Sequence, residues 1–309
     1  MKTGSIGVIG GGLMGVGIAT RFALAGFDTI LIEADTQRIA QIPKIIDDIM
    51  TELIDASICT TTQHQQVRQT LSITSDLTRL SHTPCVIEAI PEILAIKQDL
   101  YAQLELLLPA DTLILSNTSG FLPDLLCEKM QHKQRFLIAH FWNPPHLIPL
   151  VEVVPATTTA PDAIEKTMAF MRQINNEPVL LSKAIPGFIG NRLQFAVLRE
   201  ALHIVSSGAA DAATVDAVMT ASLGRRYSIM GPLESADLGG LRTVLQVGTH
   251  LVPQLASDEQ CLELLRKHID QGDVGIASGR GFHQWDAKRI TSIGERRRAL
   301  LRRNRAIDT

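Results

Sequence analysis

The fold is decided by a short stretch near the start of the chain, Ile6-Gly7-Val8-Ile9-Gly10-Gly11-Gly12-Leu13-Met14-Gly15. Its first four residues predict a strand, and the apolar spacing from Met14 onward predicts a helix. Between them stands the pattern G-x-G-x-x-G. There Gly10 permits a tight turn, Gly12 lets the backbone approach a pyrophosphate, and Gly15 lets the helix pack against the strand. A lone glycine motif is weak evidence, but in this strand-to-helix context it predicts a dinucleotide site.

Two further features support that site. The helix start, at Leu13 and Met14, offers free N–H groups and a positive dipole end to phosphate. Glu33 ends the next predicted strand, about twenty residues on, where a carboxylate can accept hydrogen bonds from the adenosine ribose. A carboxylate would repel a 2′-phosphate, so the sequence favours NAD over NADP, although Arg38 nearby leaves NADP open.

Composition narrows the class of protein. The chain has 309 residues, of which 45% are hydrophobic and 20% charged, which predicts two globular domains. The net charge of −3 gives no general attraction to nucleic acid or to an anionic membrane. No apolar run reaches the roughly 18 residues of a membrane span, and a strand begins too early for a signal peptide. The four cysteines lack metal-ligand spacing, and we expect reduced thiols in a cytoplasmic protein.

The order of predicted elements gives the fold class. Strands alternate with helices up to about residue 184, and strand signals nearly vanish after Pro186. This pattern predicts an α/β protein with a Rossmann-type, doubly wound, mostly parallel sheet, followed by an all-helical C-terminal domain. We place the domains at residues 1–184 and 185–309. We also expect helices at Gln37–Ala56 and Leu122–Met130, and a solvated helix for the arginine-rich last thirty residues or so.

A histidine and a glutamate follow on neighbouring predicted strands. His140 ends the strand Arg135–His140, and Glu152 lies inside the otherwise apolar strand Leu150–Val154. A carboxylate there is costly unless it is paired. A short connection could bring Glu152 opposite His140, which would give a general base with an orienting carboxylate. Spacing alone leaves the alternatives open: a structural histidine, and a glutamate that faces water.

Two polar segments are weaker candidates for the same site. Ser116-Asn117-Thr118-Ser119-Gly120 follows a predicted strand and offers hydroxyl and amide groups, but it is also an ordinary helix-capping sequence. Asn191 begins the helical half and could reach the cleft, or it could be a surface residue.

Taken together, these motifs resemble those of the L-3-hydroxyacyl-CoA dehydrogenase family, which also includes lambda-crystallin, L-gulonate 3-dehydrogenase and carnitine dehydrogenase. The similarity runs from about Ile6 to about Gly240. Its motifs are the glycine turn, Val86-Ile87-Glu88-Ala89-Ile90-Pro91-Glu92 with Lys97, Ser116–Ser119, His140-Phe141-Trp142-Asn143-Pro144-Pro145, Leu150–Val154 and Pro186–Arg192.

The resemblance implies roles for these residues. His140 would take the proton of the 3-hydroxyl group, Glu152 would hold the imidazolium, and hydride would pass to NAD. Ser119 and Asn191 would touch substrate and cofactor, while Glu92, Lys97 and Asn143 would contact NAD. The resemblance also implies a homodimer formed by the helical domain, a small-molecule substrate and a place in fatty acid metabolism.

One segment departs from the acyl-CoA members of the family. Their helical segment after the ribose-binding strand is rich in lysine, which suits the CoA phosphates. Here Lys44–Thr70 carries Asp47, Asp48, Glu52 and Asp55 against Lys44 and Arg68. We expect a short-chain 3-hydroxyacyl-CoA dehydrogenase, with a dehydrogenase of a free 3-hydroxy acid, of the gulonate or carnitine kind, as the alternative. A non-enzymatic role is disfavoured because His140, Glu152, Ser119 and Asn191 are all present.

Overall fold

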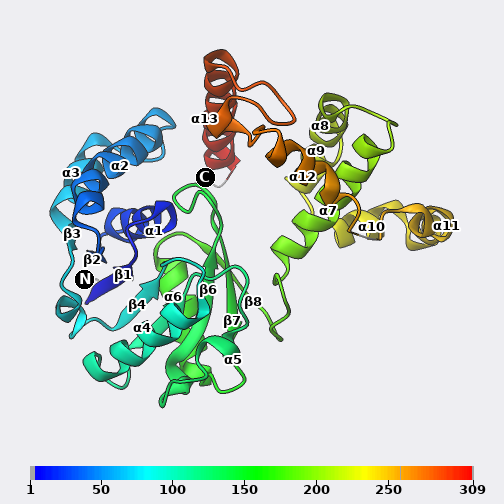
Figure 1. The fold of residues 1–309 in the computed structure, drawn as a ribbon. Coiled ribbons are helices and arrows are strands. Elements are labelled where there is room, and N and C mark those ends of the chain that lie inside the picture. The colour runs from blue at the N-terminus through cyan, green and yellow to red at the C-terminus, as the bar shows by residue number, and fades with distance from the viewer. Residues whose placement is uncertain (1–3, 258, 308–309) are drawn as a thin grey trace. The chain divides into compact units, whose positions relative to one another are not determined.

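The first predicted strand lies inside an eight-stranded sheet with the order β3-β2-β1-β4-β5-β6-β7-β8 (Figure 1). The computed structural model describes residues 4–257 and 259–307, with side chains described as far as residue 300. Neighbouring strands are parallel except for the antiparallel pair β6 and β7, so the predicted mostly parallel, doubly wound sheet is confirmed. The strands are β1 (Ser5–Ile9), β2 (Asp28–Ile32), β3 (Leu71–Thr74), β4 (Cys85–Glu88), β5 (Leu113–Ser116), β6 (Phe136–Phe141), β7 (Leu150–Pro155) and β8 (Glu177–Leu180).

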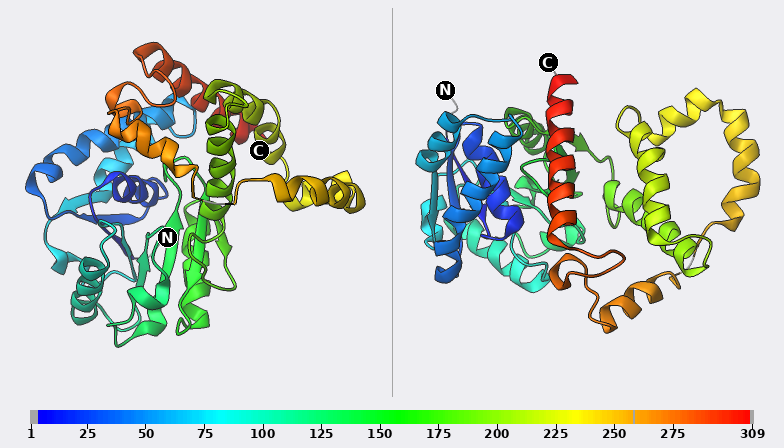
Figure 2. Two further views of the ribbon diagram at one scale, coloured as in Figure 1. Left: turned by 45° about the vertical axis from the view of Figure 1, so that its right-hand side comes forward. Right: turned by 90° about the horizontal axis from the view of Figure 1, so that it is seen from above.

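The described chain forms two compact units. The first runs to Asn191 and also takes in the chain from Arg296 onward; the second comprises Arg192–Glu295. The first unit therefore extends past the boundary predicted at residue 184 and includes the end of the last helix. The regular elements of the second unit are helical (Figure 2), as predicted. They are α7 (Gly190–Ser206), which starts in the first unit, α8 (Ala212–Ala221), α9 (Leu223–Tyr227), α10 (Pro232–Gly239), α11 (Leu241–Leu251), η3 (Val252–Gln254), α12 (Leu262–Asp270), η4 (Ile276–Ser278) and α13 (Ala287–Ile307), which ends in the first.

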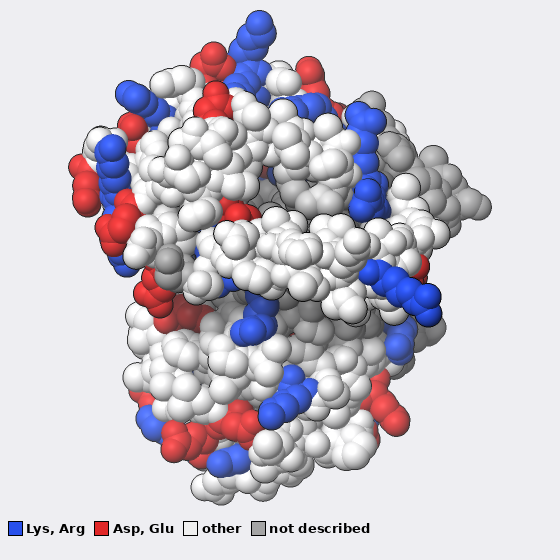
Figure 3. Space-filling model, turned by 90° about the vertical axis from the view of Figure 1, so that its right-hand side faces the viewer, with Lys and Arg blue, Asp and Glu red and all other residues white. Residues whose placement is uncertain are grey.

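The surface carries both signs of charge. On the face drawn in Figure 3, acidic and basic side chains are scattered among uncharged ones. Among the described residues, no helix is both long enough and apolar enough to cross a membrane. The four cysteines, all described, are buried, and no disulfide joins them.

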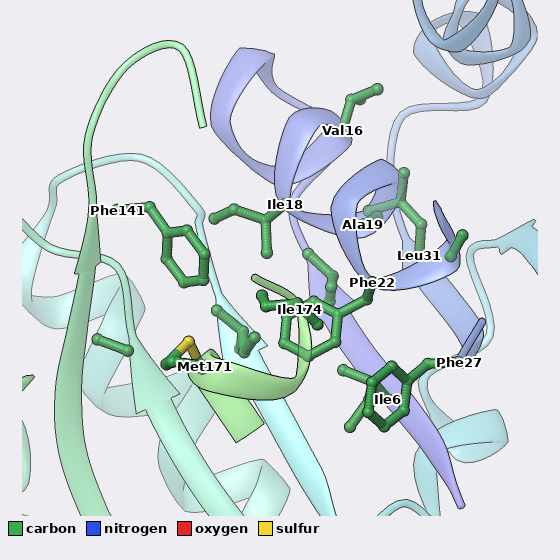
Figure 4. Close-up of a cluster of buried hydrophobic side chains, with 14 of the residues drawn as sticks. Ile6, Val16, Ile18, Ala19, Phe22, Phe27, Leu31, Phe141, Met171 and Ile174 are labelled. Carbon is green, nitrogen blue, oxygen red and sulfur yellow. The ribbon is translucent and has the colours of Figure 1, made fainter. Parts of the chain in front are cut away.

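Two hydrophobic cores lie on opposite faces of the sheet, because alternate residues of each strand point to opposite sides. In β1, Val8 belongs to one core and Ile9 to the other. Figure 4 shows the first core, in which Phe22 of α1 packs edge-on against Phe27. Helices α1 (Leu13–Leu24), α2 (Thr36–Asp55), α3 (Thr61–Thr70) and α6 (Pro161–Gln173) contribute to this core, whereas α4 (Leu94–Leu107) and α5 (Pro123–Leu126) contribute to the other.

One predicted helix differs from the structure, and another agrees with it. The helix expected at Leu122–Met130 is only the short α5, followed by turns and by η2 (Lys133–Arg135). Gln98 of α4 donates to the carbonyl of Leu125 at 2.8 Å, at the end of this short helix. The helix predicted at Gln37–Ala56 is α2, and the separate helix α3 follows it and begins with a capping box between Thr60 and Gln63.

Candidate active site

The glycine turn has the geometry that its spacing predicts. Gly10 has φ +110°, and a Cβ there would lie 2.5 Å from the carbonyl oxygen of Ala89. A Cβ on Gly15 would lie only 1.8 Å from the carbonyl oxygen of Gly10. Gly12 differs, because a Cβ there would meet nothing within 4 Å. The turn therefore needs Gly10 and Gly15 for its own folding, whereas Gly12 leaves open space beside the helix.

The start of α1 fits a phosphate group. Gly12 is the N-cap residue and provides no side-chain hydrogen bond to the first turn. Leu13, the first helical residue, is 57% exposed, and Met14 is half-buried. Uncapped N–H groups at a helix start bind anions well. These residues fit the pyrophosphate of NAD on the open side of Gly12.

Glu33 holds the same turn from the end of β2. Its Oε2 accepts from the N–H of Gly11 at 2.7 Å, and its Oε1 accepts from the N–H of Asp35 at 2.9 Å. Arg38 donates from Nε to the carbonyl of Gly11 at 2.8 Å. Glu33 and Arg38 thus both bind the backbone of Gly11, which places the Glu33 carboxylate beside the turn and the Arg38 guanidinium close to it.

A buried charged cluster lies where β4 and β5 end. Lys97 donates to Glu88 Oε1 at 2.6 Å, and both side chains are buried. Tyr101 and Ser116 donate to the other oxygen of Glu88, at 2.5 and 2.8 Å. Lys97 also lies 3.2 Å from Glu92. Burial, and then the charge of Glu88, raise the pKa of Tyr101 far above its ordinary value, so the phenol stays a donor.

This cluster contains two residues, Glu88 and Tyr101, to which sequence reasoning gave no role. Glu88 is a carboxylate in the otherwise apolar strand β4, and the same signal drew attention to Glu152 in β7. A buried charge is retained only when it is paired. Glu88 therefore fixes Lys97, and Lys97 fixes Glu92, which also accepts from Thr118 and from the N–H of Gly120.

His140 and Glu152 meet directly. They are opposite each other in the register of the antiparallel pair β6–β7, and His140 Nδ1 lies 2.9 Å from Glu152 Oε2. Both are buried, at 6% and 2% exposure. Because a carboxylate only accepts, Nδ1 carries the proton, and Nε2 remains free to accept one. The chain thus turns back after β6 and places Glu152 opposite His140, an arrangement that the sequence allowed but did not require.

Glu152 accepts from more groups than His140 alone. Its Oε1 takes the N–H groups of Ile189 and Gly190 at 2.9 and 3.0 Å, and its Oε2 also takes Trp142 Nε1 at 3.2 Å. Burial by itself would raise the pKa of Glu152, but the hydrogen bonds from His140, Gly190, Ile189 and Trp142 outweigh it and lower the pKa to about 2. The carboxylate is ionised at any pH near neutrality.

The polar turn after β5 adjoins this pair. Asn117 Oδ1 accepts from the N–H of Phe141 at 2.8 Å and ties the turn to the end of β6. Two predicted site residues also lie together here: Asn191 Nδ2 is 3.5 Å from the carbonyl oxygen of Ser119. Asn143 is exposed, on the turn that leads to a cis peptide bond with Pro144. Its side chain forms no hydrogen bond with the other predicted site residues that the structure describes.

The loop after β6 also packs on the helix that begins at the glycine turn. A Cβ on Gly17 of α1 would lie 2.6 Å from Pro145. Arg21, four residues later, donates to the carbonyl of His146 at 3.3 Å and to Asn176 Oδ1 at 2.6 Å. Burial lowers the pKa of Arg21 to about 10. These contacts, which the sequence did not reveal, fix the nucleotide turn relative to the strand that carries His140.

Comparison with known proteins agrees with this geometry. Residues 5–185 match the family model described as 3-hydroxyacyl-CoA dehydrogenase, NAD binding domain, and residues 187–285 match that of the C-terminal domain. The chain belongs to the 3-hydroxyacyl-CoA dehydrogenase family. Its cofactor is accordingly NAD, and its activity is that of an NAD-dependent oxidoreductase acting on a CH–OH group.

Similar members of the family differ in substrate. The chain is 28% identical to 5-formyl-3-hydroxy-2-methylpyridine 4-carboxylate 5-dehydrogenase of Mesorhizobium japonicum, over 98% of both chains. A crystal structure of an enzyme of that name, described as an NAD+-dependent dismutase, has a TM-score of 0.89 at 28% identity and covers 98% of this chain and 97% of its own. Identity is 33% to L-carnitine dehydrogenase of Streptomyces griseus, over 84% of this chain and 76% of the relative. Identity is 31% to a probable 3-hydroxybutyryl-CoA dehydrogenase of Bacillus subtilis, over 93% of this chain and 99% of the relative.

Proposed function

We propose that the chain oxidises the hydroxyl group of a 3-hydroxy acid or its ester, with His140 as general base and Glu152 as its orienting partner. The observation that carries this proposal is the 2.9 Å contact between His140 Nδ1 and Glu152 Oε2. With Nδ1–H donated to the carboxylate, Nε2 can accept the hydroxyl proton as the C–H bond breaks. NAD, when bound, accepts the hydride.

Glu152 makes that proton transfer easier. A buried imidazole that takes a proton becomes a buried cation, which is costly without a partner. Glu152 is already ionised and already within hydrogen-bond distance, so little rearrangement accompanies the transfer. Ser119 and Asn191, which lie against each other beside the same turn, are the residues that we propose contact the substrate.

For the substrate, the charges of the α2–α3 hairpin favour a free hydroxy acid over a CoA ester. Its three cations are all engaged: Arg38 donates to the carbonyl of Gly11, Lys44 lies 2.7 Å from Asp48, and Arg68 lies 2.5 Å from Asp47. Asp47 also pairs with His64 at 2.8 Å. A CoA phosphate would therefore meet no unpaired cation on the hairpin and would lose the charge-assisted hydrogen bonds that suit it.

A short-chain 3-hydroxyacyl-CoA ester is the second candidate, and with it a place in fatty acid metabolism. It is supported by the family match over both domains and by the 31% identity to the Bacillus subtilis relative. Basic residues outside the hairpin, such as Arg225 and Arg226, would then have to hold the CoA phosphates. A cytoplasmic location stays a prediction from the sequence.

One assay separates the two candidates. NADH formation is measured with L-3-hydroxybutyrate, L-gulonate, L-carnitine, 3-hydroxybutyryl-CoA and its 3′-dephospho form. We expect the highest kcat/KM with a free acid. If 3-hydroxybutyryl-CoA is best, the second candidate replaces the first, and an undiminished rate with the dephospho form would show that the 3′-phosphate is not bound. If no substrate of either class is turned over, the proposed chemistry fails.

We also infer a homodimer formed through the second unit. Large apolar side chains of α10, α11 and η3 are open to solvent, among them Leu233 at 81%, Leu238 at 77% and Leu245 at 71% exposure. Apolar surface gathered in this way marks an interface. Light scattering after size exclusion should give twice the 33.7 kDa of one chain, and Leu245→Glu should shift the mass toward a single chain.

A further inference from the structure

Two side-chain donors share one oxygen of the Glu152 carboxylate. Trp142 Nε1 donates to Glu152 Oε2 at 3.2 Å, and His140 Nδ1 meets the same oxygen at 2.9 Å. We propose, on the basis of the proposed function, that Trp142 is a positioning residue of the reaction: its indole N–H holds the Glu152 carboxylate in the orientation in which Oε2 faces His140.

The carboxylate needs such a restraint. The last torsion of a glutamate side chain is broad and roughly two-fold, so a buried carboxylate can turn unless donors define its plane. Oε1 is held by two backbone N–H groups, those of Ile189 and Gly190. Oε2 is held by Trp142 and His140. Both lone pairs of each oxygen are thereby used, and neither oxygen can turn away from His140 without the loss of a hydrogen bond.

The indole is itself fixed by packing. A Cβ on Gly190 would lie 2.2 Å from Trp142 Cζ2, so the ring lies directly against the backbone of this glycine. The rings of Trp142 and Phe188 flank the imidazole of His140, with centroids at 5.9 and 5.5 Å. Phenylalanine could fill much of this space but has no donor. Tryptophan alone among the apolar aromatic residues supplies both the ring and the N–H.

Trp142 should therefore affect the proton transfer and not the cofactor site. When His140 becomes charged, its Nδ1–H pulls more strongly on Oε2, while the indole N–H keeps that oxygen in place. Trp142 has no described contact with Gly12, Glu33 or Lys97, which we assign to NAD. Its loss should therefore slow the chemical step and leave the binding of NAD intact.

The test compares Trp142→Phe with Trp285→Phe, since Trp142 and Trp285 are the two tryptophans of the chain. With 3-hydroxybutyrate and 3-hydroxybutyryl-CoA as probes, we expect Trp142→Phe to lower kcat by roughly ten- to a hundredfold, as for the loss of a hydrogen bond to a charged group. The KM for NAD should change less than about twofold. The primary deuterium isotope effect on kcat, measured with 3-deuterated substrate, should rise or stay at its full value. Trp285→Phe should match the parent in all three.

A second measurement does not depend on how the Trp142 variant folds. In the Trp285→Phe protein labelled with 15N-tryptophan, the single indole N–H resonance belongs to Trp142. We expect it downfield, as for an N–H bound to a carboxylate, and displaced upfield by Glu152→Gln. An indole resonance at the position of a free indole, unmoved by Glu152→Gln, overturns the proposal.

The outcomes also separate this inference from the function on which it rests. If His140→Gln abolishes turnover while Trp142→Phe keeps the parental kcat, Trp142 has no positioning role and the proposed function stands. If Trp142→Phe raises the KM for NAD and leaves kcat unchanged, its role is structural and the proposal is wrong. If neither variant loses activity, the proposed chemistry itself fails.

Discussion

Gly15 of α1 lies against the carbonyl oxygen of Gly10, so closely that a Cβ at Gly15 would be 1.8 Å from that oxygen. The helix and the end of β1 can approach each other this closely because glycine has no Cβ. Gly12, three residues earlier, has the opposite surroundings, with nothing within 4 Å of an added Cβ. Two glycines of one motif therefore serve different purposes, and substitution should separate them.

Gly15→Ala should destabilise the fold, whereas Gly12→Ala should weaken only the binding of NAD. The first forces a methyl group into the backbone and should lower the free energy of unfolding by about 1–3 kcal/mol or more. The second should change that free energy by less than about 1 kcal/mol, because alanine is the poorer N-cap but fits the extended backbone of Gly12 and restricts the unfolded chain. It places a methyl group where we expect the pyrophosphate to approach. Urea unfolding and NAD titration measure the two effects.

A matched control exists for Gly12→Ala. Gly231 is also a helix N-cap, with φ −72° and ψ 172° against −73° and 179° for Gly12, and an added Cβ there is equally free of contacts. Gly231→Ala should leave NAD affinity unchanged. Parental NAD affinity in Gly12→Ala would show that the pyrophosphate does not lie beside Gly12.

His140→Gln should lower kcat by roughly 10²–10⁴-fold, the usual contribution of a general base. Glutamine retains a donor toward Glu152 but cannot take the hydroxyl proton. The dissociation constant for NAD should hardly change, because we assign the binding of NAD to the glycine turn and Glu33. Steady-state kinetics and fluorescence titration with NADH measure both quantities. A near-normal kcat in this variant would remove His140 from the mechanism.

Acid unfolding should report the hydrogen bonds of Glu152. Its pKa is lowered from the ordinary 4.5 to about 2 in the folded chain. Because the folded value is the lower one, ionised Glu152 stabilises the fold above about pH 4.5, and this contribution is lost as the pH falls from 4.5 toward 2. The difference corresponds to roughly 3 kcal/mol. The free energy of unfolding should therefore fall less steeply over this range in Glu152→Gln than in the parent.

Glu177→Gln is the control for that experiment, since Glu177 is an exposed glutamate of β8. It should follow the parental curve between pH 5 and 2. Parallel curves for the parent and Glu152→Gln would mean that the four hydrogen bonds do not stabilise the ionised form in solution.

Glu33→Ala should weaken NAD binding and erode the preference for NAD over NADP. The variant loses the acceptor for a ribose hydroxyl and the 2.7 Å hydrogen bond from the Gly11 N–H. We expect roughly a tenfold or larger fall in kcat/KM with NAD and a smaller change with NADP. Arg38→Ala is the companion variant, because Arg38 holds Gly11 from the other side. If Arg38→Ala changes the ratio of the two cofactors more than Glu33→Ala does, Arg38 governs the choice.

Local sequence determined the parts of this protein that depend on periodicity and on glycine. The spacing of Gly10, Gly12 and Gly15 set the turn, alternation along the strands set the two faces of the sheet, and a carboxylate in an apolar strand marked Glu152. Each of these follows from neighbours within a few residues, because backbone conformation and the direction of side chains are local properties. The same signal was present at Glu88 and would have found the buried cluster with Lys97.

Tertiary structure alone decided which partners those residues have. Glu152 receives His140 and Trp142 from the neighbouring strand and its turn, and the N–H groups of Ile189 and Gly190 from a segment 37 and 38 residues farther along. The predicted helix at Leu122–Met130 was too long, and at its observed end the carbonyl of Leu125 accepts from Gln98 of another helix. Only the packing of the sheet and its helices selects the donors that a buried carboxylate meets.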